Sequence, residues 1–135
     1  MNSSDRCRLR IVCNVCISLL VCFDPCKIQA QPQTVPHRES CTAWGAVRGQ
    51  YGHPYFGTVN SCDEAVTVQL LFPGSPNVMK HDLKPQEVFN TGLTIEEAPD
   101  LYAFTTCPVG YVPSVPLVEK NWSTIIRSQY QCVKE

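Results

Sequence analysis

Residues 65–72 read AVTVQLLF, and this stretch decides the fold. Large apolar side chains take every second position from 66 to 72, while Thr67 and Gln69 lie between them. Alternation with a period of two, rich in β-branched residues, is typical of a β-strand with one buried face. Pro73 and Pro76 follow, and the strand is expected to end there because proline cannot donate to a strand ladder.

Further short strands are expected on both sides of this central one. Most of the candidate segments end at or close to a glycine, proline or asparagine, and Pro85 favours a turn over residues 84–87. Short strands with closely spaced turns are typical of an all-β sandwich or small barrel. The remaining predicted strands cover residues 43–47, 55–60, 78–83, 88–91, 101–107 and 129–134.

The C-terminal third has a different pattern. Residues 108–116 (PVGYVPSVP) hold three Pro and one Gly, which predicts an extended, polyproline-like backbone. Asn121 is then predicted to cap a short helix over residues 122–128. One apolar stripe would lie over a sheet face, formed by Trp122, Ile125, Ile126 and Tyr130. The predicted fold is therefore mainly β: a small, disulfide-stabilised, β-sandwich-like domain with one short C-terminal helix.

Residues 1–30 are predicted to be a signal peptide. Arg6, Arg8 and Arg10 precede an apolar run over residues 11–23, and Ala30 suits the cleavage position. As a helix the run would span only about 20 Å, short of the ~30 Å hydrocarbon core. An uncleaved membrane anchor and a lipoprotein are the alternatives. Residues 31–40 are expected to be a flexible leader, and residues 41–135 a single exported β-rich domain.

Cleavage would remove five of the nine cysteines. The even number left in an exported chain predicts two disulfides. Of the three possible pairings, Cys41–Cys62 with Cys107–Cys132 is favoured because those loops are shortest, and the other two pairings remain open. No CxxC pair remains after residue 30, so neither a metal nor a cofactor is expected.

Three short segments together resemble the opening hairpin of the thaumatin-like exported β-sandwich proteins. They are 59–62 (VNSC), 66–68 (VTV) and 83–89 (LKPQEVF), with Gln86 where the family pattern has glycine. The resemblance implies an exported β-sandwich and implies no particular activity.

Composition and motifs indicate a binding or structural role. Eleven basic and twelve acidic residues give a formal net charge of −1, so nucleic-acid binding is not expected. His53 and His81 are the candidate bases, but no motif supplies an activated nucleophile beside them, so no enzyme is expected. Membrane contact is expected only through an uncleaved N-terminal segment.

The candidate binding surface is an aromatic group separated by glycines, Trp44, Tyr51, Tyr55 and Phe56, which would form a stacking platform unless at least half of it is core. The favoured function is a non-catalytic binding or structural module in the periplasm or extracellular space, with an unknown protein or glycan partner. One alternative is a small-ligand or inhibitor module that uses the 51–56 loop or the 108–116 segment. The other is a membrane-anchored envelope protein.

Overall fold

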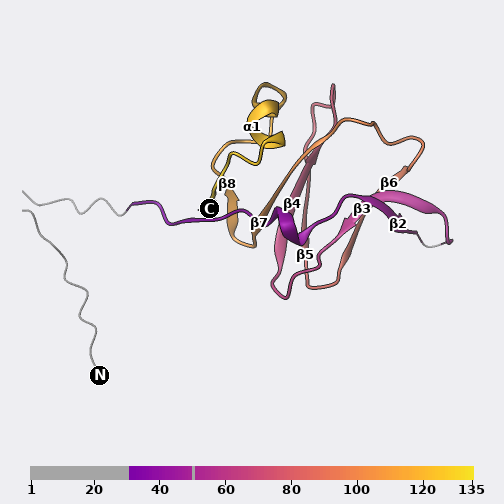
Figure 1. Ribbon diagram of the computed structural model, residues 1–135, viewed down its shortest axis with the longest axis horizontal. Coiled ribbons are helices and arrows are strands. Elements are labelled where there is room, and N and C mark those ends of the chain that lie inside the picture. The colour runs from indigo at the N-terminus through magenta and orange to yellow at the C-terminus, as the bar shows by residue number, and fades with distance from the viewer. Residues whose placement is uncertain (1–30, 50) are drawn as a thin grey trace, which may run out of the picture. The chain divides into compact units, whose positions relative to one another are not determined.

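The computed structural model describes residues 31–49 and 51–135, so the signal-peptide prediction for residues 1–30 lies outside the described residues. Over these residues the chain forms three antiparallel three-stranded sheets, with strand orders β1-β9-β8, β2-β3-β6 and β5-β4-β7 (Figure 1). The prediction of a mainly β domain with a short C-terminal helix is confirmed.

The elements follow one another in this order: β1 (Thr34–Val35), the 3-10 turn η1 (Glu39–Cys41), β2 (Gly45–Arg48), β3 (Pro54–Val59), β4 (Val66–Leu71), β5 (Met79–Leu83), β6 (Val88–Thr94), β7 (Ala103–Pro108), β8 (Tyr111–Pro113), the 3-10 turn η2 (Glu119–Asn121), α1 (Trp122–Ile126) and β9 (Cys132–Lys134). Every strand expected from the sequence has a counterpart among them, and β1 and β8 are additional.

The predicted central strand, β4, pairs with β5 on one side and β7 on the other. Val66, Val68 and Leu70 are fully buried, as the alternation predicts. Thr67 and Leu71, on the opposite face, are buried as well, so the expectation of one exposed face is wrong. The reason is that Leu71 packs in a second apolar cluster, which includes Ile125 and Tyr130 of the C-terminal part.

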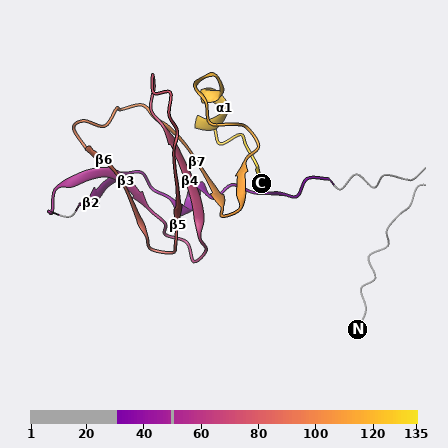
Figure 2. The same cartoon turned by 180° about the vertical axis from the view of Figure 1, so that it is seen from behind.

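Aromatic side chains fill the space between the sheets that contain β3 and β4. Phe56, Leu70 and Phe72 form one buried cluster, and Trp44 and Phe89 pack against it. Figures 1 and 2 show β2, β3 and β6 on one side of β4, β5 and β7, with α1 and β8 on the other. This arrangement is sandwich-like, because apolar side chains of two sheets meet in one core.

Both disulfides have the favoured pairing. Cys41 bonds to Cys62, and Cys107 bonds to Cys132. The two bridges indicate that the domain folds in an oxidising environment.

The C-terminal helix departs from its prediction in two respects. The Asn121 side chain makes no capping bond and instead donates to the Pro116 carbonyl, at 3.1 Å. Ile125 is buried, but Ile126 is 50% exposed, so the predicted apolar stripe is incomplete. The helix has only five residues and Ser128 takes a left-handed φ of 52° just after it, so the chain turns away before a longer stripe can form.

The Pro-rich segment 108–116 also differs from its prediction. Tyr111–Pro113 forms β8, which pairs with β9. Strand β8 lies at the edge of its sheet, so it has no neighbouring strand on its open side. Proline is tolerated there because no partner on that side needs its missing N–H.

The segment 31–40, expected to be a flexible leader, makes specific contacts in the structure. Thr34–Val35 pairs with β9, and the Arg38 amide donates to the Thr106 carbonyl of β7 at 2.7 Å. The Thr106 amide in turn donates to the Tyr130 hydroxyl at 2.9 Å. The strap, our name for residues 34–41, and Tyr130 therefore bond the backbone groups of Thr106, which point away from β4.

Tyr130→Phe is expected to lower the free energy of unfolding by about 1–3 kcal/mol, because the buried Thr106 amide loses its acceptor. Burial raises the pKa of the Tyr130 phenol, the bond from Thr106 opposes this, and the Glu39 carboxylate raises the pKa further. Because the pKa is raised in the folded state, folding favours the protonated phenol. The resulting stabilisation is complete below the unfolded-state pKa of about 10 and is lost as the pH rises above that value. Urea unfolding at pH 8 and above pH 10 measures both effects.

The control for this substitution is Tyr51→Phe, since Tyr51 is 84% exposed. It should leave stability and its alkaline pH dependence unchanged. Equal effects of the two substitutions would contradict the assigned role of the Tyr130 hydroxyl.

Candidate functional site

The structure does not bring the four predicted aromatic residues together on one surface. Trp44 stacks against Phe56 with ring centroids 5.7 Å apart, and both belong to the aromatic core. Tyr51 is 84% exposed, and Tyr55 is half-buried. Half of the predicted group is therefore core.

Tyr55 lines a groove of about 610 Å³. The groove lies between the β2–β3 hairpin and residues 94–96, which include the last residue of β6 and the two residues after it. Its walls are mostly apolar, with one imidazole and one carboxylate, and its lining residues are Ala46, His53, Pro54, Tyr55, Thr94, Ile95 and Glu96. A concave, largely apolar site with few polar groups is typical of ligand and peptide binding.

A β-bulge in β6 positions one wall of this groove. The pairing of β3 with β6 shifts register between Tyr55 and Gly57, and Gly92 takes a left-handed φ of 80° within the bulged strand. Glycine suits this position because a Cβ atom disfavours that conformation. The Thr91 hydroxyl donates to the Phe56 carbonyl at 2.8 Å and holds the bulge against β3.

The turn after β6 is also fixed by hydrogen bonds. The Glu97 carboxylate accepts from the Thr94 amide and hydroxyl, both at 3.0 Å. These bonds hold the pKa of the Glu97 carboxyl below its usual value, and the bond from the Thr94 backbone amide contributes most. Ile95, 39% exposed, is thereby held at the groove wall.

A second hollow, of about 300 Å³, adjoins the groove, since Ala46 and Ile95 line both. Aromatic and small side chains form its walls together with one carboxylate, that of Asp100. The remaining lining residues are Gly45, Phe56, Ala98, Pro99 and Tyr102.

The other candidate segment, 108–116, contributes to a different hollow of about 430 Å³. Val112, Pro113 and Pro116 line it together with Lys80 of β5. Ser114 ties the segment to β9 through a hydroxyl that accepts from the Gln131 amide at 3.0 Å.

The groups with catalytic potential are dispersed in the structure. His81 stacks on Phe89 with ring centroids 5.3 Å apart, His37 lies against Tyr130, and His53 lines the groove. All four cysteines after residue 30 are in disulfides. Within residues 31–49 and 51–135, no three potential metal-binding side chains gather, and no helix has the length and apolar character needed to cross a bilayer.

A scan against protein-family models, a search of curated proteins and a search of solved structures each found no match to this chain. The resemblance to thaumatin-like proteins therefore rests on the quoted segments alone.

Sequence reasoning missed most of the groove. No binding role is predicted for residues 94–100, and Ala46 is predicted only as part of the strand over residues 43–47. The available signal was Ile95, an apolar residue beside Glu96 and Glu97 in a stretch without strand alternation.

Proposed function

We propose that this chain is an exported, non-catalytic binding module whose binding surface is the groove beside the β2–β3 hairpin. The observation that carries the proposal is the groove itself, which has a volume of about 610 Å³ and mostly apolar walls. The β2–β3 hairpin forms one wall and the turn at the end of β6 forms the other. Binding surfaces commonly lie on loops that a rigid scaffold positions.

Export is supported by the two disulfides and by the signal-like pattern of residues 1–30. The proposed location is the periplasm or the extracellular space. A non-catalytic role is supported by the positions of the titratable groups: His37 and His81 pack against aromatic rings, and the cysteines are held in bridges.

The experiment is capture of partners by the full chain from the fluid surrounding the producing cells, with proteins and glycans quantified by mass spectrometry. Ile95→Asp is expected to reduce recovery of the partner by about tenfold or more, because it places a charge in the apolar wall of the groove. The matched control is Val109→Asp, since Val109 is similarly exposed, at 45%, and lies outside the groove. Equal recovery by the two variants, or no partner recovered by the wild type, would contradict the proposal.

A further inference from the structure

Strand β2 has one open edge beside the groove. In the described part of the chain, β2 pairs only with β3. The Gly49 amide donates to the His53 carbonyl at 3.1 Å, so Gly49 and His53 are a hydrogen-bonded pair of the hairpin. In an antiparallel pair, bonded and non-bonded positions alternate, so the backbone N–H and C=O groups of Ala46 and Arg48 point away from β3.

The other sheet edges near the core are protected in ways that β2 is not. The outward groups of β7 at Thr106 are bonded to Arg38 and Tyr130. The edge strand β5 carries Lys80 and Asp82, and charged side chains discourage strand addition. Strand β6 is bulged at Gly92, which interrupts a regular edge. Strand β2 carries one charge, on Arg48, and its exposed Ala46 is small.

Both hollows of the candidate site open beside Ala46. One contributes Tyr55 and Ile95, and the other contributes Phe56 and Tyr102. An extended segment along β2 would therefore run beside both hollows, with its side chains pointing alternately to its two faces.

The charges around the two hollows indicate which kind of peptide would bind there. Glu96 lines the first and Asp100 the second, and neither lining includes a lysine or arginine. Opposite charge across an interface favours encounter and specificity. The acidic residue in each lining therefore favours a strand that carries basic side chains as well as apolar ones.

The geometry points to β2 as a docking edge for an extended peptide segment of a partner protein, apolar in alternate positions and basic between them. The segment adds to the sheet by pairing with Ala46 and Arg48. This inference rests on the proposed function, because it names the partner class for the same groove.

The test uses the full chain and a short synthetic peptide of alternating valine and lysine, with a valine–glutamate peptide as the charge control. Amide hydrogen exchange at Ala46 and Arg48 is followed by NMR during titration. The basic peptide is expected to slow exchange at both amides by about tenfold or more, and the acidic peptide is expected to leave it unchanged.

Two substitutions at one position separate backbone pairing from side-chain contact. Ala46→Pro removes the outward N–H and is expected to weaken peptide binding by about tenfold. Ala46→Val keeps the N–H and is expected to retain the protection of both amides by the peptide, although its larger side chain narrows the two hollows that Ala46 lines. Glu96→Lys is a second, surface variant that should weaken binding of the basic peptide even if Ala46→Pro does not fold.

Unchanged binding by Ala46→Pro, or peptide binding without protection of the two amides, would overturn strand addition. Protection that appears with rising protein concentration and no peptide would also overturn it, since a second copy would then be the occupant. These outcomes leave the proposed function standing if the partner captured by the wild type is still lost in Ile95→Asp.

Discussion

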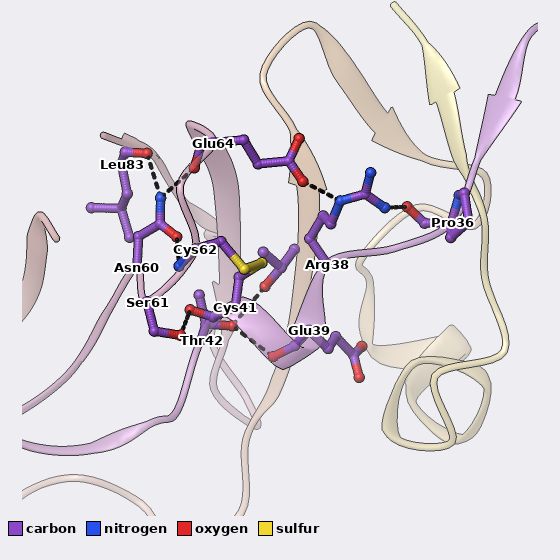
Figure 3. Close-up of a disulfide and its surroundings, with 11 residues drawn as sticks. Pro36, Arg38, Glu39, Cys41, Thr42, Asn60, Ser61, Cys62, Glu64 and Leu83 are labelled. Carbon is purple, nitrogen blue, oxygen red and sulfur yellow. Dashed lines mark hydrogen bonds and ion pairs between the residues drawn. A yellow bond between two sulfur atoms is a disulfide. The ribbon is translucent and has the colours of Figure 1, made fainter. Parts of the chain in front are cut away.

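Asn60→Ala is expected to lower the free energy of unfolding by about 3–5 kcal/mol, a large part of the stability of a small domain. The Asn60 side chain is fully buried and makes three hydrogen bonds (Figure 3). Its amide donates to the Glu64 carbonyl at 2.7 Å and to the Leu83 carbonyl at 3.1 Å, and its carbonyl accepts from the Cys62 amide at 3.0 Å. Alanine would leave all three backbone partners without this side chain, and the bond to the Leu83 carbonyl is lost in a buried site.

Chemical denaturation of wild type and variant measures this loss. The control is Asn90→Ala, since the exposed Asn90 side chain accepts from the Gly92 amide at 2.8 Å. This variant should lose less than about 1 kcal/mol, because water can replace its hydrogen bond. A similar loss in both variants would show that the burial of Asn60 adds nothing.

Replacing Cys107 and Cys132 by alanine is expected to cost about 4 kcal/mol, against about 3 kcal/mol for the same change at Cys41 and Cys62. The sequence separations are 25 and 21 residues, so the chain-entropy contributions differ by only ~0.2 kcal/mol. The packing differs more. Cys107 and Cys132 are both buried in the cluster that joins β4 to α1, whereas Cys62 is only partly buried.

Urea unfolding of the two double variants, compared with the fully oxidised wild type, checks this order. The Cys41/Cys62 double variant serves as the matched control, because it removes a loop of nearly the same length. A loss at Cys41/Cys62 equal to or greater than the loss at Cys107/Cys132 would contradict the packing argument.

The strands could be predicted from the sequence because their signals are local. Alternation over residues 65–72 and the turn at Pro85 depend on neighbouring residues only. The burial of Leu71 could not be predicted in this way, because segments after residue 110 cover that face. The contacts of the strap could not be predicted for a similar reason: its Arg38 amide bonds to Thr106 of β7, which is distant in the sequence.

The candidate site was predictable only in part. The segment 51–56 belongs to the hairpin beside the groove, and Tyr55 lines the groove. The core packing of Trp44 against Phe56 could not be predicted, because an aromatic residue that packs in a core and one that stacks on a ligand look alike in sequence. Ile95 and Glu96 come from a turn after a bulge, and a register shift of this kind depends on the partner strand.

The two bridges also bear on the order in which the chain can close. The loop 41–62 ends before the loop 107–132 begins, so the two cross-links are consecutive and neither encloses the other. Either bond can therefore form while the other half of the chain is still open, and the first closure does not force a wrong second one. Intermediates that hold one of these two native bridges should therefore be productive species in oxidative refolding.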